Sequence, residues 1–218
     1  MRAKGPPLDD LAASRGVYSR LRIQGLSRGP ALTFTDVHTM SVLFTIKDST
    51  YIGRDALARV SNLGGGAIRT MLKKLKAKGF IGANASGCYL TRSGSSALET
   101  LSKTISGFPE VTAEGMTLGN FQVAVAVRGA GKIVTSGIEQ RDSAIKLGAS
   151  GATTYVMRKG RFTIPGGSDD CEKDFPGTVW AQLRSALRPR NGDALILCGA
   201  SEKTEARLGA LAAALSLL

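Results

Sequence analysis

The chain has 218 residues, of which 43% are hydrophobic, so it is long enough to bury a core and fits two modest domains better than one. Its formal charge of +12 predicts a polyanionic partner. The charge is concentrated in residues 1–107, which hold 16 Lys and Arg against 6 Asp and Glu, whereas residues 108–218 hold 13 against 11. We therefore expect the surface that binds this partner in the first half of the chain.

The three cysteines lie far apart in the sequence, and the single histidine is His38. Cys88, Cys171 and Cys198 form no CxxC pair, and an odd number of cysteines argues against a disulfide framework. No run of about 18 apolar residues is available for a membrane span, and the opening sequence MRAKGPPLDD lacks the apolar segment of a secretory signal. We therefore expect a cytoplasmic protein with no membrane partner, no metal site and no cofactor.

Residues 1–30 are rich in Arg, Gly and Pro, and they predict a partly ordered, basic N-terminal arm. A short buried helix is predicted at residues 37–46, with the sequence VHTMSVLFTI, and Thr35 or Asp36 can cap it. His38 lies within this apolar helix, so we expect its role to be structural. A second helix is predicted at residues 53–60.

The third predicted helix is strongly basic and lies within residues 61–81, SNLGGGAIRTMLKKLKAKGFI. Its apolar residues recur at i, i+3, i+4 and i+7, which places them on one buried stripe. Gly79 ends the helix, and FIGANASGCYLT then predicts a two-stranded ribbon with a tight loop, followed by another helix. This order of elements predicts a winged helix-turn-helix domain at residues 31–107. The buried stripe consists of Ile68, Met71, Leu72 and Leu75.

Three consecutive glycines, at residues 64–66, open the basic helix. A nucleotide-binding phosphate loop needs the pattern GxxxxGK[ST] after a strand, and this stretch lacks the lysine and follows a helix, so we exclude that function. Glycines at the start of a helix on DNA let the first-turn amides come close to a phosphate. Alternatively, they only allow the second helix to pack closely on the third.

We predict that the basic helix and the ribbon bind double-stranded DNA, mainly through its phosphate backbone. Arg69, Thr70 and Lys73 are the groups expected to reach base edges. The competing interpretations are a solvated lysine face and a winged helix that binds protein. The predicted DNA contacts are Gly65, Gly66, Arg69, Thr70, Lys73, Lys74, Lys76, Asn84, Ser86 and Arg92.

Residues 102–120 are rich in Gly, Ser and Thr and predict a domain boundary. Beyond them the pattern predicts a strand, a helix, two strands around RKGR, a helix at about residues 174–187, the strand DALILCG and a C-terminal helix. This βαββαβ order with a last helix matches the ferredoxin-like pattern, and a doubly wound sheet is the alternative. The predicted fold class is therefore α+β, with a small α/β domain at residues 108–218 for dimerisation or ligand sensing.

The first helix of this second domain places Ile138, Asp142 and Ile145 at i, i+4 and i+7. An acid on an inward stripe needs a partner, which Arg128 or the threonine hydroxyls of GASGATT could provide. The alternative is an ordinary surface helix whose charged side chains pair with one another. A site for a small polar effector is accordingly predicted at Arg128, Glu139, Arg141, Asp142, Thr153 and Thr154.

The C-terminal stretch ARLGALAAALSLL is apolar over most of its helical circumference. Such a helix is buried either in the core of its domain or against another subunit. Winged-helix proteins commonly read two half-sites as a dimer, so we expect a homodimer.

Several stretches of the first half resemble archaeal winged-helix regulators: ALTFTDVHTMSVLFTI, LARVSNLGGGAIRTMLKKLKAKGFI and CYLTRSG. In the second half, GIEQRDSAIKLGASGATTYV and NGDALILCG are similar to the C-terminal domain, of unknown function, of an archaeal family of winged-helix proteins. The resemblance runs from about residue 29 to residue 218, and it implies a cytoplasmic archaeal transcription regulator. The alternative is a metabolic enzyme with an appended winged helix. We expect no enzyme, because the sequence shows no phosphate loop, metal-ligand cluster or catalytic set.

Overall fold

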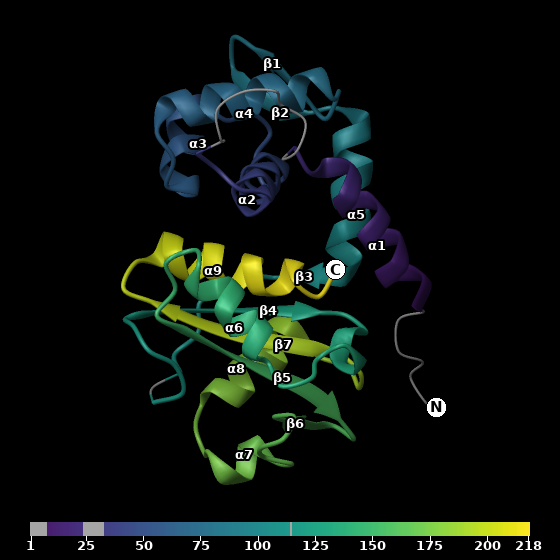
Figure 1. Ribbon diagram of the computed structural model, residues 1–218, viewed down its shortest axis with the longest axis vertical. Helices are drawn as coiled ribbons and strands as arrows, with labels where there is room; N and C mark the ends of the chain where they lie inside the picture. Colours follow the sequence, from purple (N-terminus) through teal and green to yellow (C-terminus); the bar gives the residue numbers. More distant parts are fainter. Residues whose placement is uncertain (1–7, 24–32, 114) are drawn as a thin grey trace. The chain divides into compact units, whose positions relative to one another are not determined.

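The computed structural model describes residues 8–23, 33–113 and 115–218 (Figure 1). The chain divides into two compact units. The helical unit is Gly16–Leu101, and the sheet unit combines Ser102–Leu218 with the described residues up to Arg15. The division thus falls slightly before the predicted boundary between residues 107 and 108. The predicted N-terminal arm contributes to both units where it is described, and its residues 1–7 and 24–30 lie outside the described residues.

The helical unit contains the predicted order of three helices, a hairpin and a further helix. The two hairpin strands pair antiparallel, with Ile81 opposite Leu90. At the other edge of the second strand, Ile52 exchanges two backbone hydrogen bonds with Cys88. These elements are α2 (Asp36–Lys47), α3 (Arg54–Ser61), α4 (Gly65–Ala77), β1 (Ile81–Asn84), β2 (Gly87–Leu90) and α5 (Arg92–Thr104), the last of which ends in the sheet unit.

Helix α2 begins with a capping box. Thr35, one of the two predicted candidates, is the N-cap residue, and Nδ1 of His38 accepts a hydrogen bond from the backbone N–H of Thr35 at 3.1 Å. Burial lowers the pKa of His38. The neutral imidazole is needed here, because a protonated Nδ1 cannot accept a hydrogen bond. The structural role predicted for His38 is therefore confirmed.

Helix α1 (Leu8–Leu21) corrects the prediction of an N-terminal arm. Two charged side chains of the helical unit hold the end of this helix. The Asp36 carboxylate accepts a hydrogen bond from Nε of Arg22 at 2.6 Å, and the Lys78 ammonium donates to the carbonyl oxygens of Arg20 and Arg22. A cation at this position satisfies carbonyls that have no partner within the helix. These contacts come from distant parts of the chain, so local sequence periodicity did not reveal α1.

The sheet unit contains a five-stranded sheet with the spatial order β3-β4-β7-β5-β6, and every neighbouring pair is antiparallel. The predicted order along the chain, βαββαβ and a last helix, is present from β4 onward. However, a ferredoxin-like sheet has the third strand of this motif between the first two, and here the fourth, β7, occupies that position. The strands are β3 (Ile105–Ser106), β4 (Phe121–Val127), β5 (Gly151–Arg158), β6 (Arg161–Thr163) and β7 (Ala194–Ala200).

The burial of β7 explains its central position. All seven residues of this strand are buried, and a continuous apolar strand is stable only where both of its faces are covered. The element order does not contain this information, which is why the ferredoxin-like arrangement was wrongly predicted. The doubly wound alternative also fails, because the neighbouring strands described in this sheet are antiparallel, not parallel.

Helices cover both faces of the sheet (Figure 1). Helices α6 (Ile138–Ile145) and α9 (Lys203–Leu215) pack against each other and against one face, while α8 (Val179–Leu187) packs on the other. The single helix predicted at residues 174–187 is split into α7 (Cys171–Asp174) and α8. Pro176 lies in the gap, where it lacks an amide donor and disfavours a helical conformation at the preceding residue.

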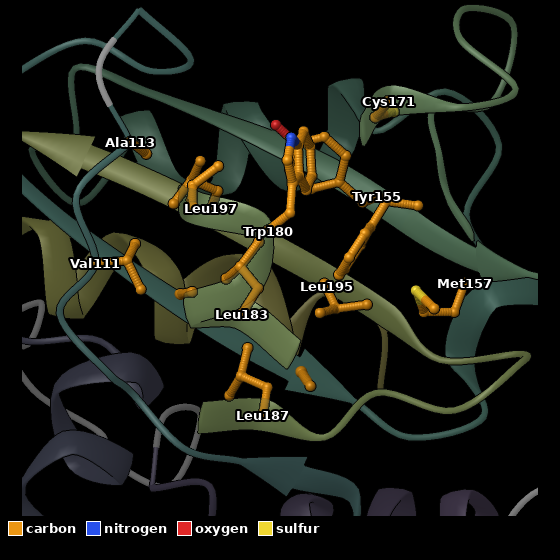
Figure 2. Close-up of a cluster of buried hydrophobic side chains, with 14 residues drawn as sticks. Val111, Ala113, Tyr155, Met157, Cys171, Trp180, Leu183, Leu187, Leu195 and Leu197 are labelled. Atoms are coloured by element: carbon orange, nitrogen blue, oxygen red, sulfur yellow. The ribbon is translucent and has the colours of Figure 1, made fainter. Parts of the chain in front are cut away.

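An aromatic core lies between α8 and the sheet (Figure 2). The Trp180 ring lies 5.3 Å from the Tyr155 ring and 5.0 Å from the Phe162 ring, between centroids. Val111 and Ala113 belong to the same core. They come from the segment predicted to be a domain boundary, which also provides β3, so that segment is an integral part of the sheet unit.

On the opposite face, α9 approaches the sheet closely through a glycine. A Cβ placed on Gly209 would lie 2.8 Å from both Sγ of Cys198 and Cβ of Ala149. Nine of the thirteen residues of α9 are buried. The packing therefore favours the first of the two alternatives, in which this helix belongs to the core of its domain.

Candidate nucleic-acid interface

Helix α4 has one apolar face and one basic face. The predicted stripe of Ile68, Met71, Leu72 and Leu75 is buried, as expected. Because α-helical residues at i, i+4 and i+7 share a face, Arg69, Lys73 and Lys76 lie together on the exposed side. Lys74 is half-buried at the edge of this face.

The basic face has no acidic neighbour in the sequence. Residues 56–98 contain no Asp or Glu. Within the described residues, none of the ion pairs involves a basic residue of α4. The positive charges of Arg69, Lys73 and Lys76 are therefore not neutralised by ion pairing inside the described chain.

The three glycines before and within the first turn of α4 have no packing function within the described chain. A Cβ placed on Gly64, Gly65 or Gly66 would meet no heavy atom within 4 Å. None of the three has a positive φ, and Gly64 has φ −67° and ψ 155°, an extended conformation open to most residues. The interpretation that these glycines allow close packing of the second helix on the third is therefore wrong.

The glycines instead leave the start of α4 open to solvent. Gly64 is the N-cap residue and provides no side-chain hydrogen bond. The first intrahelical bond is donated by the amide of Ile68 to the carbonyl of Gly64, so the preceding amides of the first turn are available to an external acceptor. All three glycines are exposed.

The predicted contact residues of the hairpin are divided between its two ends. At the tip, the amide of Ser86 donates to Oδ1 of Asn84 at 2.9 Å, so Asn84 shapes the turn. Arg92 lies at the base, where it begins α5 next to Thr91, whose hydroxyl donates to the carbonyl of Gly79 at 2.6 Å. Arg92 is therefore held close to the end of α4, whereas Asn84 and Ser86 are not.

Thr70 makes a local bond that limits its predicted role. Its hydroxyl donates to the carbonyl of Gly66 at 3.0 Å. The oxygen remains able to accept a hydrogen bond, but the proton is already engaged. Arg69 is therefore the stronger candidate for reading base edges.

Arg54 and Tyr51 are exposed residues near the hairpin that were not among the predicted contacts. The positive charge of Arg54, like that of Lys76, acts on Cys88 of β2, where it opposes the burial that raises the pKa of this thiol. Tyr51 is 48% exposed and packs edge-on against Tyr89, with 5.8 Å between ring centroids. The density of basic residues after Tyr51 was the available signal for Arg54, whereas the position of Tyr51 required the fold.

The residues predicted to bind an effector are only partly brought together. Arg128 lies apart from the others in a buried ion pair, where it donates to Asp193 at 2.8 Å. Glu139 and Asp142 are exposed, and Asp142 pairs with the neighbouring Arg141. The remaining three residues, Arg141, Thr153 and Thr154, line one small cavity.

The inward face predicted for α6 is wrong. Ile138 is 51% exposed and Ile145 is 47% exposed, whereas Gln140 and Ala144 are buried. The reason is the close approach of α9, because a Cβ on Gly209 would lie 3.4 Å from Cβ of Ala144. Only small side chains fit between two helices at this distance, so the large apolar residues of α6 point outward.

The cysteines of the sheet unit are buried thiols. Burial raises the pKa of Cys198 to about 12 and also raises the pKa of Cys171. In the part of the chain that the structure describes, no three His, Cys, Asp or Glu side chains are grouped so that they could hold a metal ion. None of the described helices combines the length and apolarity needed to cross a bilayer.

These features define a two-part α+β protein with a basic helix and hairpin in one unit and an antiparallel sheet in the other. Residues 34–96 match the model of the PH0730-like N-terminal domain, and residues 118–217 match a domain of unknown function, DUF4443. The chain is also similar to the solved structure of hypothetical protein PH0730 from Pyrococcus horikoshii OT3. The identity is 25%, the TM-score is 0.68, and the match covers 84% of this chain and 92% of that chain. No curated protein matches the chain.

The two domain matches leave residues 97–117 between them, and the second match begins within the predicted boundary segment at residues 102–120. The second match also confirms that the C-terminal half resembles a domain of unknown function.

Proposed function

We propose that this protein is a transcription regulator that binds double-stranded DNA through a winged helix-turn-helix in its helical unit. The observation that carries the proposal is the start of α4, where a Cβ on any of three exposed glycines would meet no described atom within 4 Å and the glycines lead into a basic helix face. A glycine in a helix costs about 1 kcal/mol relative to alanine. Glycines with no internal function are therefore consistent with an external surface that approaches the backbone.

A DNA phosphate fits this position chemically. The open first-turn amides of α4 can donate to phosphate oxygens, and the positive end of the helix dipole favours the negative charge. Lys73 and Lys76 lie further along the same face, where they can neutralise adjacent phosphates. Arg69 lies between the glycines and these lysines, and its planar guanidinium can bond to the two acceptors of a guanine edge.

The hairpin supplies a second, smaller contact in this proposal. Its base carries Arg92 beside the end of α4, and its tip exposes Asn84 and Ser86. Contacts of this kind to sugar and phosphate fix the position of a protein on the duplex but carry no sequence information. Recognition of two half-sites would in addition require a two-fold dimer of the chain, which light scattering of the free protein and of its DNA complex can test.

The experiment is fluorescence anisotropy of the full chain on a labelled duplex of random sequence, at several salt concentrations. We expect the affinity to fall steeply with salt, by about 0.9 log units per log unit of salt for each phosphate contact. The double variant Lys73→Gln/Lys76→Gln should flatten this slope. Lys146→Gln, which alters an exposed lysine of the sheet unit, is the matched control. An affinity independent of salt, or equal slopes for both variants, would refute an interface on α4.

Specific recognition requires a second measurement, because random DNA reports only backbone contacts. Duplexes selected from genomic fragments by the full chain provide the specific site. Arg69→Ala should weaken binding to the selected duplex more than binding to random DNA, by about 1–3 kcal/mol for a bidentate contact to guanine. Equal losses on both duplexes would assign Arg69 to the phosphate backbone.

A further inference from the structure

A small cavity lies in the sheet unit, where the start of α6 meets β5. Its volume is about 140 Å³. An apolar cavity of about this size accommodates benzene, so the space suits a molecule of about six non-hydrogen atoms. The lining includes Ser136, Gly137, Ile138, Arg141, Thr154 and Ile164.

One buried hydroxyl in this lining has no partner. Thr154 is 3% exposed, and its Oγ1 makes no hydrogen bond to any other described residue. Side chains alternate along a strand, so Thr154 lies on the face of β5 opposite Tyr155, which belongs to the aromatic core. This hydroxyl lies beside the start of α6, because a Cβ placed on Gly137 would lie 3.4 Å from Oγ1. A buried hydroxyl without a hydrogen-bond partner is stabilised by a ligand that forms a hydrogen bond with it.

The start of α6 adds backbone donors. Gly137 is the N-cap residue, has φ +82° and provides no side-chain cap. The amide of Arg141 donates to the carbonyl of Gly137 at 3.0 Å, whereas the amides of Glu139 and Gln140 have no acceptor among the described residues. Free amides at a helix N-terminus favour a negatively charged acceptor.

The charges around the cavity also favour an anion. The Arg141 guanidinium lies at its rim, with half of the side chain exposed. Asp142 pairs with Arg141, but neither Asp142 nor Glu139 is among the residues that line the cavity. A carboxylate in the cavity would therefore meet the Thr154 hydroxyl and the Arg141 guanidinium near the N-terminus of α6, without a lining acid to repel it.

Apart from the hydroxyls of Ser136 and Thr153, the rest of the lining is apolar. Ile138 is 51% exposed at the mouth of the cavity, and Ile164 and Ala152 contribute further aliphatic surface. Transfer of a short aliphatic group onto this surface is favourable. We propose that the cavity binds a small aliphatic carboxylic acid, with the carboxylate at Thr154 and the first turn of α6 and the aliphatic part against Ile138. This site lies entirely in the sheet unit and does not depend on the proposed binding of DNA.

The test is a titration of the 15N-labelled full chain with isovalerate, followed by NMR, with inorganic phosphate and neutral isovaleramide as comparison probes. We expect saturable shifts of the Glu139 and Gln140 amides with isovalerate. Thr154→Val should weaken this binding at least about tenfold, because it removes a bond to a charged group and keeps the shape. Arg141→Gln should also weaken it.

Thr163→Val is the matched control, since Thr163 is also buried but its hydroxyl donates to the carbonyl of Val156 at 3.0 Å. We expect this variant to lower the thermal stability and to leave the affinity for isovalerate unchanged. Thr154→Val should leave the stability of the ligand-free chain unchanged or raised, so unfolding cannot explain its loss of binding. The proposal is overturned if isovalerate causes no saturable shift, if isovaleramide binds equally well, if phosphate binds in its place, or if the two threonine variants bind alike.

Discussion

Replacement of the first two glycines of α4 separates the stability of the helix from its proposed function. In the double variant Gly65→Ala/Gly66→Ala, neither new methyl group meets another atom within 4 Å. Each change should stabilise the fold by about 0.4–1 kcal/mol, mainly because alanine restricts the unfolded chain. For a unit of this size, each kcal/mol raises the melting temperature by roughly 4–8 °C.

The same methyl groups should weaken the binding of DNA. They would stand beside the open first-turn amides, where a phosphate oxygen must come within about 3 Å. Loss of one hydrogen bond to a charged group is worth about 1.5–3 kcal/mol, which corresponds to an affinity at least about tenfold lower. The assays are thermal unfolding and fluorescence anisotropy on the same preparations of the full chain.

Gly16→Ala is the control, because Gly16 is also exposed, lies in helix α1 and would place its Cβ in open space. It should raise stability by a comparable amount and leave DNA binding unchanged. If the double variant is more stable but binds DNA as well as the unchanged chain does, the glycines have no role in binding and the reasoning is refuted.

Three further predictions concern stability. The pKa of His38 is lowered in the folded chain, so the unfolded state binds the proton more readily. The contribution of His38 to stability should therefore be complete above about pH 6.5 and fall as the pH drops below it. In thermal unfolding, His38→Gln, which keeps a hydrogen-bond acceptor, should lose less stability between neutral and acidic pH than the unchanged chain does. Asp193→Ala leaves Arg128 in a mostly buried position without its partner and should cost about 3–5 kcal/mol in chemical denaturation, whereas Asp142→Ala, in a half-exposed pair, should cost about 0–1 kcal/mol. Leu211→Asn in α9 should unfold the sheet unit by circular dichroism, and a folded monomer would instead reassign this helix to a subunit interface.

The sequence predicted best the helices and strands that bury one face, because burial of one face sets the spacing of their apolar residues. The stripe from Ile68 to Leu75 in α4 is an example, because a helix on the surface of a core repeats its apolar residues at the helical period. The hairpin after Gly79 was predicted for a related reason, since a short polar loop between alternating strands has few alternative conformations. Once the buried stripe of α4 is known, the remaining residues of the helix must face outward, and these include the basic residues of the candidate interface.

The features that the sequence did not predict depend on contacts between distant segments. Helix α1 is fixed by Asp36 and Lys78, which lie far from it in the chain. The outward face of α6 follows from the approach of Gly209, and a pattern of large apolar residues cannot show a contact made by small ones. In the candidate effector site, Arg141, Thr153 and Thr154 were correctly grouped, but Arg128 was not, because its buried partner Asp193 lies 65 positions away.

The central position of β7 determines when the sheet unit can form during synthesis. Until β7 is present, β4 has only the two-residue β3 as a neighbour and β5 has only the three-residue β6, and isolated pairs of strands this short are marginal in water. The helical unit is contiguous and is complete in sequence by Leu101, so it can fold while the ribosome is still translating the second half. The sheet must wait for Ala200, and its pairing of distant strands makes its folding slow. The described residues up to Arg15, which are translated before the helical unit, therefore join a unit that closes only after β7 has emerged.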